Sequence, residues 1–379
     1  MSRRVLFVWM LVCALAVVVP KAWAQRPPQT DPPRGVFTQD VVMSWDRSAV
    51  PGDIELWAVR TLLAYDADLS QRYGELYMVC ASSTDASTGK CATEDMLVSL
   101  ASQVTPVALL FRENRSGLTT SLDVSASLYR AFTMPDCFLD FWSNMPFGIP
   151  SSFAPDCGGE IAAGTGKGLT FRSTSLQLLT AGHWKATLEL RLRRPPSEHL
   201  ATYIFNFDFT ITDYDAISIY LPGFEQGNAN VNMDFRYDPV HGEIGGSKDV
   251  DMCLYDGLGS QSQYLGVTVR DAGPRPPGGD GFSIWHRDTS GDERERVDFD
   301  VWLNYAGSKR RMRNGVEEQL LGVDSTALRL VKLPKIDHPV FCVPTPITLE
   351  TPRFKASTKR EGVYTGELKV ELRVPTARP

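Results

Sequence analysis

The stretch Val363–Val374, close to the C-terminus, constrains the fold most, because its second half alternates strictly between apolar and charged side chains. The apolar positions are Leu368, Val370, Leu372 and Val374, and the charged positions are Glu367, Lys369, Glu371 and Arg373. This period of two predicts a β-strand with one buried face. Only Pro-Thr-Ala-Arg-Pro follows. We therefore expect the last sheet of the chain to be one strand short.

The first 24 residues have the organisation of a secretory signal. Arg3 and Arg4 precede an apolar run, Val5–Val19, and Ala22-Trp23-Ala24 supplies small residues at the cleavage positions. The apolar run is too short to span a bilayer. We predict an exported protein whose mature chain starts at Gln25.

Charge and cysteine content agree with export. Removing the signal removes Arg3, Arg4 and Lys21 and no acid, so the net charge falls from −6 to −9. Such an acidic chain is not expected to bind nucleic acid. Six cysteines remain, and an even number in an exported chain favours disulfides. Their spacing suggests the pairs Cys80 with Cys91, Cys137 with Cys157, and Cys253 with Cys342, although spacing alone leaves other connectivities open.

The remaining patterns predict an all-β chain with two sandwich domains. In the clearest hairpin, Trp184–Arg193 and Tyr203–Ile211 both alternate between apolar and polar residues. We place the domain boundary at the polar break Asp213–Ala216, which gives a first domain of residues 25–213 and a second of 217–379. In the second domain we expect the strands Ile217–Leu221, Val231–Tyr237, Ser247–Tyr255, Val267–Arg270, Val297–Tyr305, Leu328–Leu333, Val340–Leu349 and the final strand.

Other segments are expected to be irregular or are ambiguous. Gln25–Gly35 contains four prolines and predicts an extended tail without a strand. Lys309–Arg313 is expected to be a basic loop. Gly164–Gly168 lacks the spacing of a phosphate-binding loop and is expected to be a flexible loop beside Cys157. The segment Ile54–Ala64 fits either a helix or a strand.

No motif for catalysis or for a cofactor stands out. The five histidines have no metal-ligand spacing, and no serine lies in a G-x-S-x-G turn. A pair of catalytic carboxylates needs no local motif, so a secreted carbohydrate-active enzyme with a β-sandwich appendage remains an alternative.

Three arginines mark a candidate binding surface. Arg191 and Arg193 lie on the outward face of the hairpin, and Arg194 lies at its turn. A guanidinium presents a planar fork that suits carboxylate or phosphate, including the carboxylate of an acidic sugar. The alternative is a solvated strand face whose charge is balanced by Glu189 and Glu198.

The motif Asp249-Val-Asp-Met-Cys-Leu-Tyr-Asp-Gly257 resembles the CblD-like pilus biogenesis initiator family, the tip adhesins of CFA-type fimbriae and cable pili. The resemblance continues in Ile219–Phe224, Pro334–Cys342 and Tyr364–Val370 and covers essentially the whole mature chain. It implies an N-terminal adhesin domain and a C-terminal pilin domain, both Ig-like sandwiches, with no enzymatic activity and no cofactor.

The resemblance also implies partners. The pilin domain of such proteins lacks its last strand, which a periplasmic chaperone supplies first and the major pilin supplies later, at an outer-membrane usher. Gly366 lies at the fourteenth position from the end, where chaperone–usher pilins usually have glycine, and Arg378 stands where they tend to have tyrosine. The implied acceptor groove contains Gly366, Leu368, Val370, Leu372 and Val374.

Receptor binding in the family involves a cluster of arginines, and the chain departs from it at one position. Arg193 and Arg194 occupy the positions of two adjacent family arginines, whereas Glu75 replaces the third. Arg72 lies nearby and joins Arg191 as a further candidate. The resemblance thus implies a fimbrium-tip protein that binds a host-cell glycan or glycoprotein. A shaft pilin is the other alternative, but it should carry a donor strand near its mature N-terminus.

Overall fold

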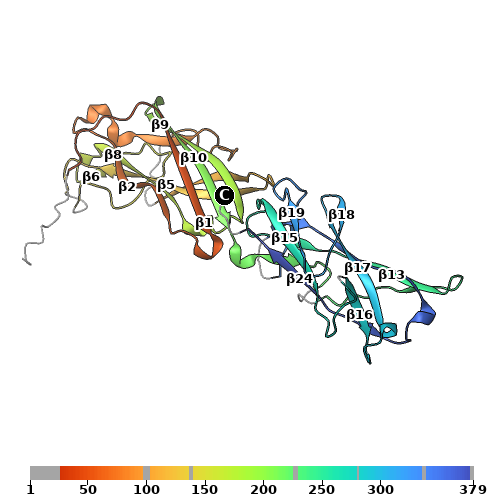
Figure 1. The fold of residues 1–379 in the computed structure, drawn as a ribbon. Coiled ribbons are helices and arrows are strands. Elements are labelled where there is room, and N and C mark those ends of the chain that lie inside the picture. Colours follow the sequence, from red (N-terminus) through yellow and green to blue (C-terminus); the bar gives the residue numbers. More distant parts are fainter. Residues whose placement is uncertain are drawn as a thin grey trace, which may run out of the picture.

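The computed structural model describes residues 26–96, 103–135, 140–224, 229–279, 281–334 and 339–375. Figure 1 shows two bodies arranged end to end, with β1 to β10 in one and the later strands in the other. The prediction of an all-β chain with two tandem domains is confirmed. None of the helices in the described ranges is long and apolar enough to cross a membrane. The predicted signal, residues 1–24, lies outside the described residues.

The first domain is built on one large sheet. Its elements are β1 (Gly35–Asp46), β2 (Ile54–Tyr65), β3 (Tyr77–Cys80), β4 (Thr105–Glu113), β5 (Thr119–Ala131), β6 (Asp156–Cys157), β7 (Glu160–Ile161), β8 (Gly164–Phe171), α2 (Ser173–Leu176), β9 (Gly182–Arg194) and β10 (Glu198–Thr212). The strand order is β1-β10-β9-β4-β5-β8-β2. β3 pairs with the second half of β9, beyond the residues that pair with β4. The ambiguous segment around Ile54 is therefore a strand, which pairs with β8.

The predicted hairpin forms the centre of this sheet and of its core. Phe205, Phe207 and Phe209 of β10 are buried, and Phe207 makes an edge-to-face contact with Phe171 at 5.1 Å between ring centres. Such aromatic pairs contribute about 1 kcal/mol beyond the area they bury. The alternation along β10 thus fixes which face packs inward and which face is turned away from the core.

The described residues of the second domain form three smaller sheets. Its strands are β11 (Ser218–Tyr220), β12 (Arg236–Asp238), β13 (Glu243–Val250), β14 (Cys253–Tyr255), β15 (Tyr264–Asp271), β16 (Phe282–His286), β17 (Arg296–Tyr305), β18 (Ser308–Arg311), β19 (Glu317–Leu321), β20 (Arg329–Val331), β21 (Val340–Pro344), β22 (Ile347–Lys355), β23 (Tyr364–Thr365) and β24 (Leu368–Arg373). The sheet orders are β11-β14-β21-β20, β12-β13-β22-β17-β16-β23 with β18 paired to β17, and β19-β15-β24. Their apolar faces enclose a second core.

Two predicted loops are strands, so those predictions were wrong. Gly164–Gly168 begins β8 and is buried, because its glycines let the backbone approach aromatic side chains. A Cβ on Gly166 would lie 2.7 Å from the ring of Trp142. Lys309–Arg313 mostly forms β18, which returns along β17 after a turn at Ala306 and Gly307, both with positive φ.

Three predicted strands have different limits. Val340–Leu349 is divided between β21 and β22, which belong to different sheets, and Pro346 stands at the break. Ser247–Tyr255 is similarly divided between β13 and β14. Val231–Tyr237 is regular only where β12 begins, and no residue from 229 to 235 belongs to a strand in the described chain.

The proline-rich segment at the mature N-terminus is held against the first domain instead of forming a tail. Thr30 exchanges two backbone hydrogen bonds of 2.9 Å with Tyr65. Asp31 accepts a hydrogen bond of 2.8 Å from the hydroxyl of Tyr73, and Pro27 and Pro32 are buried. Residues 26–34 form no strand, as predicted, although Gly35 begins β1. The prediction of a tail was wrong.

Two of the three suggested disulfides are present. Cys80 is bonded to Cys91, and Cys253 is bonded to Cys342. Cys137 lies outside the described residues, so the suggested pair with Cys157 is not described. The bond between Cys253 and Cys342 joins β14 to β21, two paired strands of one sheet. The disulfide therefore reinforces the pairing of two strands whose cysteines are 89 positions apart in the sequence.

Contacts at the junction join the two domains closely. Asp213 donates its backbone N–H to the carbonyl of Gly257 over 2.7 Å. Arg115, in the turn between β4 and β5, donates to the carbonyls of Val323 and Thr326 over 2.6 and 2.9 Å and also to the carbonyl of Asp324. Burial lowers the pKa of Arg115. One side chain of the first domain thus satisfies three carbonyls of the second.

Candidate functional site

The hairpin of β9 and β10 places the predicted arginines at the end of the first domain sheet. Leu190 and Leu192 are fully buried, so the alternate residues Arg191 and Arg193 lie on the opposite face. β3 extends this face, because Tyr77 pairs with Arg193 and Val79 pairs with Arg191.

Arg72 joins the same region through the turn that follows β9. It has left-handed backbone angles and donates to the carbonyl of Pro195 over 3.1 Å. Arg194 donates to the carbonyl of Gln71 over 3.4 Å, so Arg72 and Arg194 lie next to each other. The structure therefore brings the four arginines together at one end of the hairpin.

Each of these arginines already has a glutamate partner. The pairs are Arg72 with Glu75, Arg191 with Glu189, Arg193 with Glu94, and Arg194 with Glu198. The hydrogen bond to Glu75 raises the pKa of Arg72, and the bond from Arg194 lowers the pKa of Glu198. Glu75, at the position where the resemblance implies an arginine, thus neutralises Arg72. The surface is balanced in charge instead of strongly basic.

Arg193 has the loosest of the four pairs. Its Nη1 lies 3.5 Å from Glu94, whose side chain is 78% exposed, and its Nε is buried without a hydrogen-bond partner in the described residues. Arg194, in contrast, makes two bonds of 2.8 and 2.5 Å to one oxygen of Glu198. An incoming carboxylate could therefore displace Glu94 more easily than Glu198. Arg193 is the guanidinium best placed to change partners.

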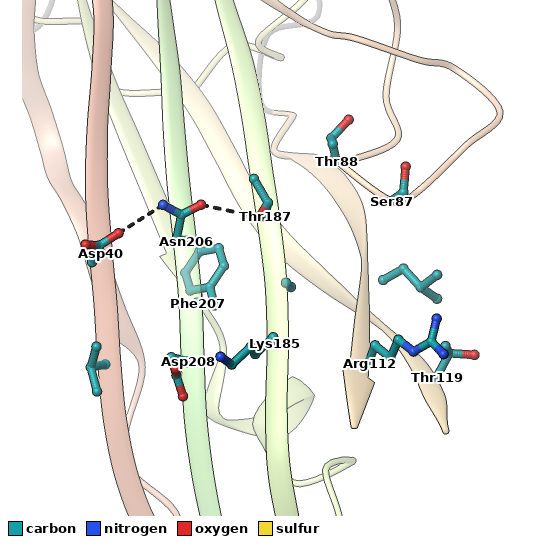
Figure 2. A pocket seen from close by; sticks show the side chains of 13 residues that line it. Asp40, Ser87, Thr88, Arg112, Thr119, Lys185, Thr187, Asn206, Phe207 and Asp208 are labelled. Carbon is teal, nitrogen blue, oxygen red and sulfur yellow. Dashed lines mark hydrogen bonds and ion pairs between the residues drawn. The ribbon is translucent and has the colours of Figure 1, made fainter. Parts of the chain in front are cut away.

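A hollow of about 760 Å³ lies at the domain junction, beside Arg115 and Gln261. A larger one, of about 860 Å³, lies on the sheet face that carries Arg191 and Arg193. Figure 2 shows the residues that line it. The larger hollow is lined by Asp40, Val42, Ser87, Thr88, Leu110, Arg112, Thr119, Lys185, Ala186, Thr187, Asn206, Phe207 and Asp208. Sequence reasoning missed it, because these residues come from several strands and a loop and share no local motif.

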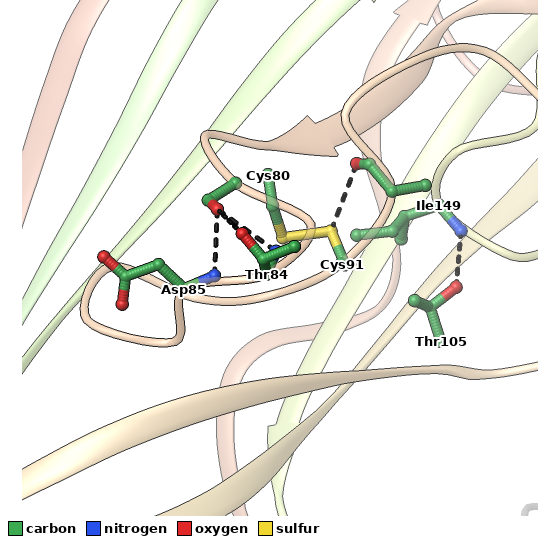
Figure 3. The surroundings of a disulfide bond; sticks show 8 residues. Cys80, Thr84, Asp85, Cys91, Thr105 and Ile149 are labelled. Atoms are coloured by element: carbon green, nitrogen blue, oxygen red, sulfur yellow. Dashed lines mark hydrogen bonds between the residues drawn. A yellow bond between two sulfur atoms is a disulfide. The ribbon is translucent and has the colours of Figure 1, made fainter.

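The loop closed by Cys80 and Cys91 forms one wall of the larger hollow (Figure 3). Its backbone is fastened to both neighbouring strands: the N–H of Leu110 donates to Ala86, and the N–H of Glu189 donates to Thr88, each over 2.9 Å. The hydroxyl of Ser82 accepts the N–H of Asp85 within the loop. The loop thus fills the space where β4 and β9 separate.

The second domain has an open edge at its last strand. β24 pairs with β15 from Asp271 opposite Leu368 to Gly266 opposite Arg373, and no other strand of the described chain pairs with it. Leu368, Val370, Leu372 and Val374 pack against the core but remain partly exposed. The predicted strand is confirmed, and its apolar face is only half covered.

Gly366 lies where the chain passes from one sheet to another. β23 pairs with β16, whereas β24 pairs with β15, and only Gly366 and Glu367 separate them. A Cβ on Gly366 would lie 2.9 Å from Cγ2 of Ile284 and 3.0 Å from the carbonyl of Ser283. Glycine is needed because the backbone crosses in direct contact with β16.

Comparison with known proteins decides the family. The family model for the first domain of CfaE, the E subunit of CFA/I fimbriae, matches residues 20–214, and the model for its second domain matches residues 217–376. The chain belongs to the CfaE family. The CfaE protein of Escherichia coli is 27% identical over 308 residues, which cover 79% of this chain and 80% of that protein.

Solved structures of the CfaE family share the fold. The crystal structure of CfaE, the adhesive subunit of CFA/I fimbria of enterotoxigenic Escherichia coli, is 24% identical, with a TM-score of 0.68 over 93% of this chain and 95% of that one. A chaperone–tip adhesin complex of CFA/I fimbriae matches with a TM-score of 0.66 at 23% identity, over 93% of this chain and 99% of that one. Membership of the family makes this chain a fimbrial subunit of the CFA/I type.

Proposed function

We propose that the chain is the tip adhesin and assembly initiator of a CFA/I-type fimbria. Residues 25–213 form the adhesin domain, which binds a host-cell glycan or glycoprotein. Residues 217–379 form a pilin domain that accepts a donor strand, first from a periplasmic chaperone and then from the major pilin at the outer-membrane usher. Neither step requires catalysis or a cofactor.

The observation that carries the proposal is the open edge of β24. An edge strand with unpaired backbone groups and a half-covered apolar face is a template for strand addition. On our proposal, residues 229–235 form the opposite wall of the acceptor groove, because Val231 and Met233 are also half-buried against the same core. The absence of regular structure there has a simple cause: the strand that would order this wall belongs to a partner.

The N-terminal segment supports a position at the end of the polymer. Residues 26–34 are held on the first domain by Thr30 and Asp31 and contain no strand that could be donated. A protein that accepts a strand but gives none can occupy only the terminus of a head-to-tail assembly.

A fusion tests strand acceptance. The mature chain is expressed alone and with the N-terminal strand of the major pilin fused after Pro379 through a short linker. We expect aggregation of the first form and a soluble monomer of the second, with a higher melting temperature. A fused peptide in which the apolar residues are replaced by serine is the control. Equal behaviour of all three forms would refute the proposal.

Substitution tests the receptor surface. We expect Arg193→Ala and Arg194→Ala to abolish binding of the fused protein to host cells, and Arg191→Ala and Arg72→Ala to weaken it, while all four variants keep the wild-type melting temperature within about 2 °C. Arg172→Ala is a matched control, because Arg172 is an exposed arginine of the same domain, paired with Asp53. Wild-type binding by both the Arg193 and Arg194 variants would remove the site from this surface.

A further inference from the structure

We propose that the hollow beside the Cys80–Cys91 loop binds an acidic saccharide, that is, a sugar unit that carries a carboxylate. This inference rests on the proposed function in one respect: it assumes that the ligand is part of a host-cell surface. It names a second site on the adhesin domain, next to the arginine end of the hairpin, and the class of sugar that fits it.

Two basic residues of neighbouring strands, Arg112 and Lys185, lie opposite each other at this hollow. Arg112 of β4 pairs directly with Lys185 of β9, which places their Cβ atoms roughly 5 Å apart on one face. Lys185 is compensated by Asp208 at 3.5 Å. The side chain of Arg112 is exposed and makes no ion pair or hydrogen bond within the described part of the chain.

The directions of these side chains leave room for an anion. In Figure 2 the ammonium of Lys185 turns toward Asp208, whereas the guanidinium of Arg112 turns the other way, toward Thr119. Because Lys185 is compensated by Asp208, the guanidinium of Arg112 is the group that an incoming carboxylate would meet. The four arginines at the end of the hairpin all form ion pairs with glutamates. Among the described residues, Arg112 differs from them in having no acidic partner for its guanidinium group.

The opposite side of the hollow offers groups that match sugar hydroxyls. Nδ2 of Asn206 donates to Oδ1 of Asp40 over 2.9 Å, and the hydroxyl of Thr187 donates to Oδ1 of Asn206 over 3.3 Å. This chain of hydrogen bonds orients the amide and leaves Oδ2 of Asp40 to accept from a ligand. Hydroxyls both donate and accept, and Thr88 is among the residues that line the hollow.

The site is preformed and has apolar elements as well as polar ones. Asp40, Asn206 and Thr187 lie on the adjacent strands β1, β10 and β9, and the loop that carries Thr88 is closed by a disulfide. Val42, 74% exposed, and Leu110 add aliphatic surface for the C–H face of a sugar ring. A preformed hollow in which polar groups converge beside some apolar surface is suited to a small ligand.

Titration with a matched pair of sugars tests the inference. The mature chain, in whichever of the two C-terminal forms is monomeric, is labelled with ¹⁵N and titrated with D-glucuronate and with D-glucose, which differ only in the carboxylate. We expect glucuronate to shift the amide signals of Thr88, Thr187 and Asn206 in a saturable manner and to bind roughly tenfold or more tightly than glucose. Acetate controls for the carboxylate alone.

Variants assign the contacts. Arg112→Gln should reduce glucuronate binding to the level of glucose, and Asn206→Ala should weaken both sugars, whereas Arg172→Gln should leave both unchanged. Equal binding of glucuronate and glucose, equal binding of acetate and glucuronate, or an unaffected Arg112→Gln variant would each overturn the proposal. Glucuronate binding that depends on Arg112, together with cell binding that depends on Arg193, separates this site from the one proposed above.

Discussion

The ammonium nitrogen of Lys167 lies 3.7 Å from the centre of the Trp57 ring and 4.0 Å from that of Tyr203. Lys167 belongs to β8, in the stretch whose glycines resemble a phosphate-binding loop, but its side chain is buried and has no carboxylate partner among the described residues. The rings favour the ammonium form, and burial opposes it. Burial dominates and lowers the pKa of Lys167 from 10.5 to about 7.

Stability should therefore rise with pH between about 7 and 10.5, because the unfolded chain holds a proton on this lysine that the folded chain releases. We expect Lys167→Met to raise the free energy of unfolding at pH 6 by about 2 kcal/mol and to remove this part of the pH dependence. Chemical denaturation from pH 6 to 10 measures the free energy of unfolding and its dependence on pH. Lys90→Met is the control, because Lys90 is an exposed lysine of the same domain. An unchanged slope in Lys167→Met would contradict the assignment.

The second domain should lose stability in acid through Glu295. The bond of 2.7 Å from Arg360, helped by bonds from Ser290 and Thr289, lowers the pKa of Glu295 to about 2. A lowered carboxylate pKa gives stability that is complete above about pH 4.5 and is lost as the pH falls toward 2. Glu295→Gln should destabilise the domain at pH 7 but hardly at pH 2.5.

Thermal unfolding at several pH values checks this expectation. Glu293→Gln is the control, because Glu293 belongs to the same short segment but its side chain is 86% exposed and lies 3.8 Å from Arg296. If both variants behave alike, the Arg360 contact does not set the acid stability of the domain.

Gly366→Ala should destabilise the second domain by about 1–3 kcal/mol, because the added Cβ would overlap Ile284 and the carbonyl of Ser283. It should also weaken binding of a donor-strand peptide, since β24 would shift relative to β16. Gly223→Ala is the matched control: no atom lies within 4 Å of the Cβ that it would add. Calorimetry measures both variants, and equal melting temperatures would show that the crossing tolerates a side chain.

The periodicity of the sequence predicted those strands whose pattern of burial is contained within a single segment. The strict alternation of Trp184–Arg193 and of Leu368–Val374 identified β9 and β24, because a strand with one buried face needs no information from elsewhere. β8 was missed, because glycine has no side chain to alternate, and its burial depends on aromatic residues such as Trp142. The pairing of each arginine with a glutamate was only partly foreseen, since Glu75 and Glu94 reach the hairpin from other segments.

The domain junction depends on Arg115 more than on any pattern visible in the sequence. Its guanidinium donates to Val323, Asp324 and Thr326, so Arg115→Met would leave three carbonyls of the second domain without this partner. We expect a loss of about 2 kcal/mol and a separation of the two unfolding transitions, which wild type should show as one or as closely overlapping ones. Differential scanning calorimetry measures both effects, and Arg172→Met, exposed on the same domain, is the control. If the two domains of Arg115→Met still unfold together as in wild type, Arg115 does not hold the junction. The backbone hydrogen bond between Asp213 and Gly257, which no side-chain substitution removes, would then be the main contact.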